Sequence, residues 1–359
     1  MNINSYIRKF GKYTFEERPF NHVDALIFSE LSMISFEPVL KDKEFVTLKD
    51  IELKDILKEM VSDSPDKLYN KNQIRAMVES DRYKDLTIKY MRREFSKELV
   101  NQFYAITILF PNGDFYVSYR GTDVSMIGWK EDFLLATQDT YLGQEQALDY
   151  LRSVIQKEQG RFYIGGHSKG GNLAFYSTLH LTEEESQRLI ESYSFDGPGM
   201  RKDIKELPSY PFVIDKMVKF RTYNNVIGAT FNQMDKYKVV HSTGLLFGGH
   251  DLYYWQISPT TGDFSYAKDI SSLSKKYSDR FMKWVESLPI EDRKLATNTL
   301  FEVFHDCNDI YDLAKNWVKD LLNIKKSLNN YSEEDQKKLK MIFKTLLQYL
   351  FNFNKVKKD

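Results

Sequence analysis

The residues best suited to chemistry in this chain lie from Gly166 to Gly170 and read Gly-His-Ser-Lys-Gly. This Gly-x-Ser-x-Gly pattern is typical of a nucleophilic serine on a sharp turn between a strand and a helix. The flanking sequence agrees, because an apolar strand-like run, Phe162–Ile164, precedes the motif and an apolar helical run, Asn172–Leu181, follows it. Glycine suits both ends because a side chain there would collide with so tight a turn. Ser168 is therefore the candidate nucleophile, and the alternative is a buried serine in a glycine-rich turn.

A serine hydroxyl needs a base at neutral pH, and histidine is the usual one. The chain has six histidines. His241 and His250 follow the last predicted strands, where the histidine of a serine–acid–histidine site comes in chain order. His250 is favoured because Gly248 and Gly249 let its loop arch over the sheet, whereas His241 directly follows the apolar pair Val239-Val240. The remaining four are predicted to be structural or solvated: His22, His167, His180 and His305.

The histidine in turn needs an acid that holds its tautomer and stabilises its cation. Asp196 directly ends a predicted strand and is followed by Gly197-Pro198-Gly199, so it is the candidate acid; the alternative is a turn-forming aspartate. A second position follows the next predicted strand, but it carries Asn224 and no carboxylate. An amide there could orient an imidazole without offsetting its charge. Asn224 is therefore kept only as an accessory residue.

A tetrahedral intermediate also needs N–H donors for its oxyanion. In serine hydrolases of this kind one donor follows the nucleophile and the other lies in an earlier loop at the end of a strand. Lys169 follows Ser168, and Thr122 lies in Tyr119-Arg120-Gly121-Thr122-Asp123, directly after a predicted strand. The sequence therefore predicts an oxyanion hole formed by Thr122 and Lys169.

These side chains need a sheet whose strands end at one edge. Apolar runs alternate with helical patterns in the middle of the chain, which predicts an α/β fold with a mostly parallel sheet flanked by helices. Residues 1–100 look mainly helical, and from about Ser271 the pattern is helical to residue 359. We expect a domain over 1–270 and a C-terminal helical extension over 271–359. The predicted strands are Phe103–Phe110, Phe115–Tyr119, Phe162–Ile164, Tyr193–Phe195, Met217–Thr222 and Tyr237–Val240, with a helix over Gly143–Gln159.

Composition narrows the function classes. Lys plus Arg and Asp plus Glu each number 51 in the 359 residues, so no net charge points to nucleic acid. The N-terminus lacks the apolar core of a secretory signal, and Cys307 is the only cysteine, which together favour a cytoplasmic location. Cys307 itself is expected to pack in a helix. No histidine pair has a zinc-like spacing and no phosphate loop is present, so we expect neither metal nor organic cofactor.

Two segments carry a resemblance to known proteins. Val117–Thr122 with Trp129 and Asp132, followed by Gly165–Asn172, resemble the class 3 (fungal-type) lipases. The chain is also similar, over most of its length, to a bacterial family of uncharacterised α/β-hydrolase-like proteins. That likeness includes Thr14–Asn21, Asp24–Leu26, Phe195–Gly199, and His250 with Trp255.

The resemblance implies an α/β-hydrolase fold with a lipase-like core and a Ser-Asp-His triad. Ser168 and His250 match the motif positions, and Thr122 matches the oxyanion residue of the lipases. The departure is Asn224, because such proteins usually carry an aspartate there. Either Asp196 is the working acid or the triad is impaired.

The expected function is a serine hydrolase of the lipase or esterase type that cleaves an acyl ester through Ser168, His250 and Asp196. Its substrate would be a small-molecule or lipid ester. The competing hypothesis is a lipase-fold protein that binds without catalysing, and it rests on Asn224 and on the lack of an assigned reaction in the family that the chain resembles. The sequence sets neither the acyl length, the head group nor the oligomeric state, and it leaves peptidase, phospholipase and thioesterase activity open.

The last helical segment has one apolar stripe and a basic opposite face. From residue 321 to 359 there are nine lysines and four acidic residues. One interpretation is a helix that packs on the hydrolase core, and the other is peripheral contact with an anionic membrane. The stripe consists of Leu339, Ile342, Phe343, Leu346, Leu347, Leu350 and Phe351.

Overall fold

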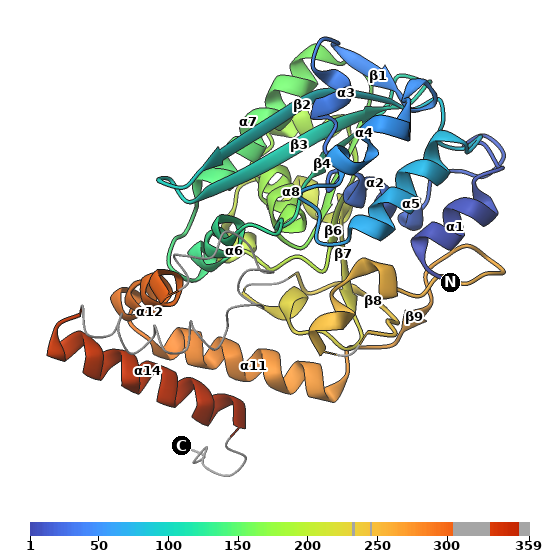
Figure 1. Ribbon diagram of the computed structural model, residues 1–359. Coiled ribbons are helices and arrows are strands. Elements are labelled where there is room, and N and C mark those ends of the chain that lie inside the picture. Colours follow the sequence, from blue (N-terminus) through green and yellow to red (C-terminus); the bar gives the residue numbers. More distant parts are fainter. Residues whose placement is uncertain (232–233, 245, 304–330, 352–359) are drawn as a thin grey trace.

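A computed structural model describes residues 1–231, 234–244, 246–303 and 331–351 as one sheet with helices on both faces (Figure 1). The strands are β1 (Phe45–Thr47), β2 (Thr87–Ser96), β3 (Asn101–Leu109), β4 (Phe115–Tyr119), β5 (Phe162–His167), β6 (Leu189–Phe195), β7 (Met217–Thr222), β8 (Lys238–Val240) and β9 (Tyr266–Ala267). The helices are α1 (Ile3–Phe10), α2 (His22–Leu31), α3 (Glu37–Leu40), α4 (Leu53–Met60), α5 (Lys67–Val78), α6 (Met126–Asp132), α7 (Leu142–Lys157), α8 (Lys169–Leu179), α9 (Glu183–Gln187), α10 (Tyr210–Val213), α11 (Ser272–Ser287), α12 (Ile290–Val303) and α14 (Glu333–Phe351).

The strands lie across the sheet in the same order as along the chain. β4 to β8 run parallel in the centre, and β1, β2, β3 and β9 extend the sheet with antiparallel pairings. Because every parallel connection advances in one direction, right-handed crossovers place their helices on one face. α7 and α8 cover that face and pack on β3, β4 and β5. The carboxyl ends of all parallel strands consequently meet at one edge of the sheet, which is where the predicted site residues lie.

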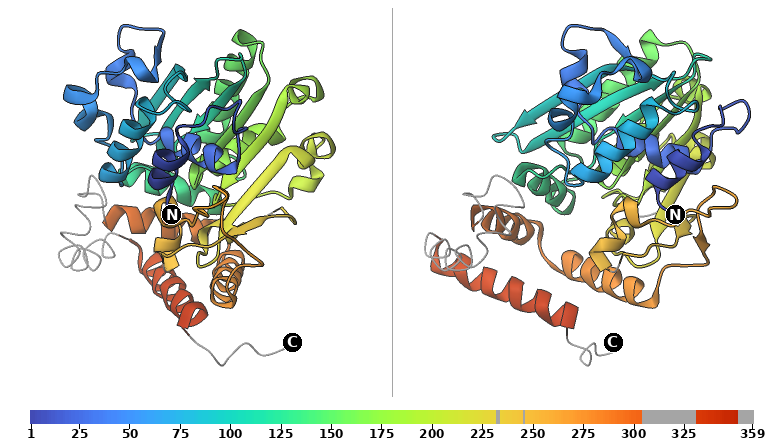
Figure 2. Two further views of the ribbon diagram at one scale, coloured as in Figure 1. Left: turned by 90° about the vertical axis from the view of Figure 1, so that its right-hand side faces the viewer. Right: turned by 45° about the vertical axis from the view of Figure 1, so that its right-hand side comes forward.

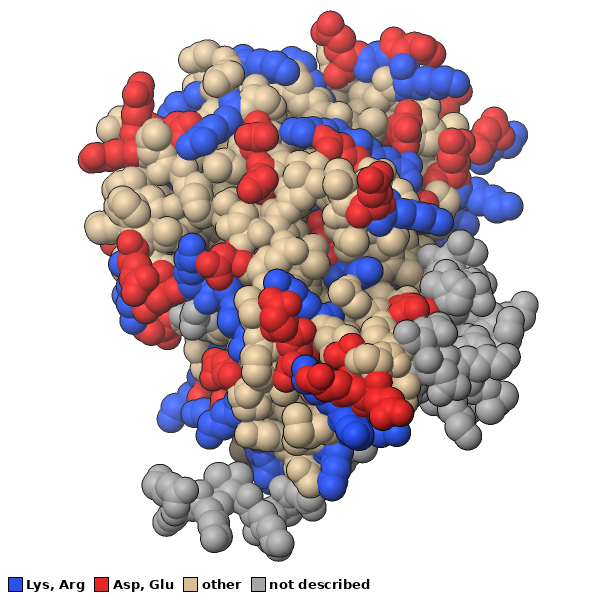
Figure 3. Space-filling model, turned by 90° about the vertical axis from the view of Figure 1, so that its left-hand side faces the viewer, with Lys and Arg blue, Asp and Glu red and all other residues tan. Residues whose placement is uncertain are grey.

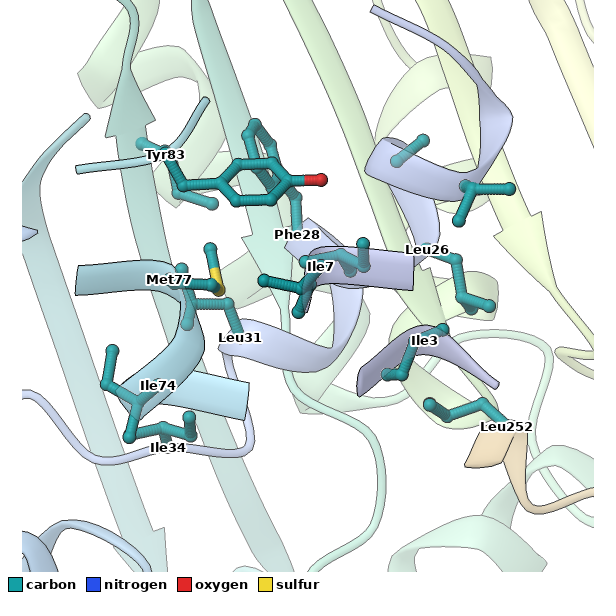
Figure 4. Close-up of a cluster of buried hydrophobic side chains, with 14 of the residues drawn as sticks. Ile3, Ile7, Leu26, Phe28, Leu31, Ile34, Ile74, Met77, Tyr83 and Leu252 are labelled. Carbon is teal, nitrogen blue, oxygen red and sulfur yellow. The ribbon is translucent and has the colours of Figure 1, made fainter. Parts of the chain in front are cut away.

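The N-terminal helices cover the opposite face. α2 begins at Asn21, whose side chain caps the helix in a capping box with Asp24. Every residue from Val23 to Leu31 is buried, because α2 lies between the sheet and the helices α1 and α5. Figure 4 shows this layer, in which Ile7, Phe28 and Met77 from the three helices meet.

β4 is buried on both faces and packs against a layer of helices on each. Phe115, Val117 and Tyr119 belong to the core under α7. On the other face Tyr116 and Ser118 donate hydrogen bonds to backbone carbonyls of α2 at 3.0 and 2.8 Å. Both faces therefore fix the end of β4, from which the loop with Thr122 departs.

The first hundred residues differ from the mainly helical prediction. They contain α1 to α5 as expected, but also β1 and the ten-residue β2, which pairs with β3. β2 reads Thr-Ile-Lys-Tyr-Met-Arg-Arg-Glu-Phe-Ser, and most of its residues are only partly buried. The charged side chains of this outer strand hid the alternation on which a strand prediction depends. The later strand and helix predictions lie within a few residues of the observed elements.

The C-terminal helices gather at one end of the molecule in all three ribbon views (Figures 1 and 2). α11 lies beside η5 (Ile227–Ala229), which follows β7, and α12 lies beside α6, which follows β4. α14 packs on both α11 and α12, with Trp284 donating a hydrogen bond to the Thr345 hydroxyl at 3.3 Å. These helices therefore stand at the carboxyl edge of the parallel strands.

Of the apolar stripe in α14, Leu339 and Ile342 are fully buried. The side chains of the other five stripe residues are outside those described, as are His305 and Cys307. Among the helices that the structure describes, none is both long and apolar enough to span a bilayer. Figure 3 shows one face of the molecule, on which basic and acidic side chains are interspersed.

Candidate active site

The Gly-x-Ser-x-Gly segment forms a sharp turn between a strand and a helix. β5 ends at His167 and α8 begins at Lys169, so Ser168 stands alone between them with φ 55° and ψ −126°. A positive φ costs a non-glycine residue about 1–3 kcal/mol. A Cβ on Gly166 would overlap the backbone of Gly170, and one on Gly170 would overlap the carbonyl of Tyr119. The two glycines therefore let the elbow close and pack against the end of β4.

Ser168, His250 and Asp196 form an unbroken chain of contacts. His250 Nε2 lies 2.8 Å from Ser168 Oγ, and His250 Nδ1 lies 2.8 Å from Asp196 Oδ2. The histidine side chain is 16% exposed and the aspartate side chain 1%, so the aspartate is closed off from solvent while Ser168 and His250 stay partly exposed. Three residues that are 82 and 54 positions apart in sequence thus meet at one edge of the sheet.

Asp196 follows β6 directly and also has a positive φ, 52°. Its backbone N–H donates to Phe220 O of β7 at 2.9 Å, which fixes the carboxylate beside the next strand. A Cβ on Gly228 would overlap the carboxylate, so glycine is required in the loop that passes over it. Burial alone would raise the pKa of Asp196, but the hydrogen bond and charge of His250, with Asn225, outweigh it and hold that pKa below its usual value.

The structure places Asn225, rather than Asn224, against the acid. Asn225 Nδ2 donates a hydrogen bond to Asp196 Oδ2 and lies 3.1 Å from His250 Nδ1. Its Oδ1 accepts from the N–H of Val226 at 2.8 Å, which fixes which end of the amide faces the aspartate. The Nδ1–H group of His250 donates its hydrogen bond to Asp196. Asn225 Nδ2 and His250 Nδ1 are then both donors, so the amide of Asn225 bonds to the carboxylate and not to the imidazole. The Asn224 carbonyl instead lies near Gly249.

The loop that carries His250 is bonded to His167 at the end of β5. It runs from β8 through η6 (Leu246–Gly249) to His250, and η7 (Leu252–Tyr254) follows. His167 Nε2 lies 2.8 Å from the His250 carbonyl, and the two rings are 4.6 Å apart. Burial, followed by the charge of His250, lowers the pKa of His167 to about 3. His167 is therefore neutral at physiological pH, and the carbonyl contact places its single proton on Nε2.

The two predicted oxyanion residues flank the elbow. Lys169 is the first residue of α8, so its N–H has no carbonyl within the helix to bond. The loop with Thr122 approaches so closely that a Cβ on Gly121 would lie 2.9 Å from the His167 carbonyl. Thr122 Oγ1 donates to Asp132 Oδ2 at 2.6 Å. Burial, partly offset by Lys169, raises the pKa of Asp132 to about 6.

The other described histidines lie away from Ser168 in the contacts they make. His22 meets the Tyr266 hydroxyl at 3.3 Å, His180 meets the carbonyl of Tyr176 at 2.7 Å, and His241 is exposed beside Tyr223. Within the described ranges, no three His, Cys, Asp or Glu side chains are grouped so as to hold a metal ion. Sequence reasoning missed Asn225 and the role of His167, although both are immediate neighbours of residues that it singled out.

Comparison with known proteins adds one finding. Residues 77–302, more than half of the chain, match the Mbeg1-like family. The chain belongs to the Mbeg1-like family. Ser168, Asp196 and His250 all lie within the matched Mbeg1-like segment, and α14 follows it.

Beyond the Mbeg1-like match, no curated protein matches the chain. Among solved structures, the crystal structure of M37 lipase covers 59% of this chain and 70% of its own, with 13% identity and a TM-score of 0.39.

Proposed function

We propose that this protein is a serine hydrolase that cleaves an acyl ester, with an α/β-hydrolase fold and a lipase-like core. The observation that supports it most is the pair of 2.8 Å contacts that His250 makes with Ser168 and Asp196. The strained elbow and membership of the Mbeg1-like family, which is lipase-like, agree with this proposal, as does the resemblance of the elbow segment to the class 3 lipases.

The chemistry follows from the positions of the side chains. His250 Nε2 takes the proton from Ser168 Oγ as that oxygen attacks the acyl carbon, and Asp196 stabilises the resulting imidazolium. The N–H groups of Lys169 and Thr122 stabilise the tetrahedral oxyanion. His250 then protonates the leaving alcohol, which leaves an acyl group on Ser168. Water, activated by the same histidine, attacks the acyl-enzyme, releases the acid and restores the serine.

The surroundings of the oxyanion loop favour an apolar acyl group. Trp129 and Phe133, on the elements that follow Thr122, are 42% and 37% exposed and provide apolar surface after the oxyanion loop. Such surface suits an ester with an apolar acyl group.

A fluorophosphonate probe tests the proposal directly. Wild-type protein should become labelled on Ser168, and the Ser168→Ala variant should not. A panel of p-nitrophenyl esters of increasing chain length, with Ser168→Ala as the blank, then measures turnover and acyl preference.

Folded wild-type protein that neither reacts with the probe nor exceeds the Ser168→Ala blank would overturn the proposal. That result would favour the competing hypothesis, a lipase-fold binding protein. The 2.8 Å contact between Asp196 and His250 supports the hydrolase over this alternative, because it supplies a carboxylate where Asn224 offers none.

A further inference from the structure

The side chain of Lys169 has no part in the chemistry above, yet it is the most completely bonded cation near the site. Its Nζ donates to Gln102 O at 2.7 Å, to Gln102 Oε1 at 2.6 Å and to Glu131 Oε2 at 2.6 Å. An ammonium group has three protons, so every donor is satisfied. Both members of the Lys169–Glu131 pair have side chains that are 1% exposed. This lysine therefore cannot reach a substrate.

Glu131 links this lysine to the other half of the oxyanion hole. It lies near the end of α6, and its Oε2 also accepts from the Gln102 N–H at 3.1 Å. The next residue, Asp132, accepts from the Thr122 hydroxyl at 2.6 Å. Two adjacent carboxyl groups thus hold two different segments: one holds the residue that follows the nucleophile, and the other holds the loop at the end of β4.

The packing around α6 is tight enough to transmit this connection. A Cβ on Gly128 would lie 3.1 Å from Gln102 Oε1 and 3.2 Å from Thr122 Cγ2. A Cβ on Gly143 would lie 2.5 Å from Glu131 Oε1. The carboxylate of Glu131 is therefore enclosed by backbone on one side and by Lys169 on the other.

Stability alone does not account for such a pair. The free energy needed to remove two charges from water is about as large as the free energy gained from their attraction. Apolar side chains of similar size therefore often stabilise a core equally well. Burial accordingly raises the pKa of Glu131, against the attraction of Lys169. What an ion pair adds is direction, because its hydrogen bonds fix where both partners lie. Oxyanion donors need such precision, within about 0.5 Å.

We infer that the buried Lys169–Glu131 pair is a positioning pair that sets the spacing between the Lys169 N–H and the Thr122 loop. The catalytic use of that spacing rests on the proposed function. Glu131 and the Lys169 side chain act through backbone groups and touch neither substrate nor reacting atoms.

The test uses full-length Glu131→Gln, which keeps the shape and one acceptor, and the double variant Lys169→Met/Glu131→Gln, which leaves no lone buried charge. The matched control is Asp85→Asn, which breaks a half-exposed Lys49–Asp85 pair of 2.8 Å on the surface. Two measurements are made on each protein. One is amide hydrogen exchange across residues 120–136 and 168–172, and the other is kcat and KM for the best p-nitrophenyl ester, with inhibition by a trifluoromethyl ketone.

We expect faster exchange confined to those two segments in both variants and in neither segment of the control. Loss of one oxyanion donor lowers kcat about 10²–10³-fold, so misplacing it should lower kcat about 10- to 100-fold with KM nearly constant. The affinity for the ketone, which forms a tetrahedral adduct, should fall in parallel with kcat.

Unchanged exchange in the two segments would overturn the inference whatever the activity. Faster exchange with unchanged kcat and ketone affinity would also overturn it, because the pair would then hold the segments without setting the oxyanion hole. A wild-type protein that is inert to ester and to fluorophosphonate would defeat the proposed function instead, and the exchange measurement would still decide whether the pair holds the two segments. If Glu131→Gln fails to fold, the double variant supplies the same comparison.

Discussion

Replacing Asp196 with asparagine removes one charge from the proposed triad and leaves its shape intact. In serine proteases the corresponding amide lowers kcat by about 10⁴, in part because the amide selects the wrong histidine tautomer. Here two donors point at the same oxygen: Asn225 Nδ2 donates to Asp196 Oδ2, and Thr222 Oγ1 lies 3.4 Å from it. An asparagine would therefore keep its carbonyl at that position, facing His250 Nδ1, and the correct tautomer would be preserved.

Only the charge is then lost, together with a weak contact from the Thr222 N–H, which lies 3.4 Å from Oδ1. We expect kcat to fall by about 10³, which corresponds to about 4 kcal/mol at 1.36 kcal/mol for each factor of ten. Asn225→Ala, which frees the amide orientation, combined with Asp196→Asn should bring the fall to about 10⁴. The assay is kcat for the best p-nitrophenyl ester, with circular dichroism to show that the fold is retained.

Asn224→Ala is the matched control and should change kcat less than about threefold, since Asn225 and not Asn224 contacts the acid. Asp196→Asn that retains more than a tenth of wild-type kcat would refute the assignment of Asp196 as the acid. A sharp rise in kcat on Asn224→Asp would refute it too, because the working acid would then belong after β7.

The remaining predictions concern other parts of the molecule. The pKa of Asp132 is raised from 3.8 to about 6, so its contribution to stability is present below pH 3.8 and is lost as pH rises through 6. In urea unfolding, this group should make the wild type more stable at pH 4 than at pH 7.5 by about 2 kcal/mol, and Asp132→Asn should remove that part of the difference in unfolding free energy. An unchanged difference would contradict the shift. His167→Phe should lower kcat about tenfold with little change in KM, because the His250 carbonyl loses its donor; wild-type kinetics would show that the loop needs no such support. Gly170→Ala should destabilise the fold by several kcal/mol, of order 3, because its Cβ would overlap the Tyr119 carbonyl, and a thermal melt within 2 °C of wild type would count against that geometry. Vesicles with anionic lipid should retain the full-length chain in flotation at low salt and release it at high salt, and truncation at Tyr331 should abolish retention; if the truncated protein aggregates instead, the α14 stripe is core and the membrane contact is to be discarded.

Sequence reasoning identified the candidate site through residues that stand in local patterns. Ser168 stands in a motif, and Asp196 and His250 stand at strand ends or in a glycine loop, so topology alone brings them to one edge. The contact of Asn225, and not Asn224, with the candidate acid depends instead on the turn after β7, whose dihedral angles the sequence does not state. The same limit applies to Lys169. Its backbone role follows from the motif, but its side chain meets Glu131 only because α6 folds back across β3, which no local pattern records.

The strand prediction failed for β2, whose side-chain pattern does not show that it is part of the sheet. β7 was predicted at its observed bounds because Met217, Val218 and Phe220 give it an apolar pattern, and five of its six residues are buried even though two of them are Lys219 and Arg221. β2 was not predicted because it lies toward the outer side of the sheet and carries Lys89, Arg92 and Arg93 among its residues. A strand that pairs through its backbone while its side chains face water leaves little hydrophobic alternation to detect.

The strictly sequential order of β1 to β9 has a consequence for biosynthesis. Each strand that leaves the ribosome finds its pairing partner already made and directly before it, so the sheet can grow by addition at one side and needs no later insertion. The proposed nucleophile follows β5, the proposed acid comes only after β6, and the proposed base comes only after β8. A nascent chain therefore contains Ser168 before the two groups proposed to activate it, so under the proposed function the site is complete only once residue 250 has been added and its loop has closed over the elbow.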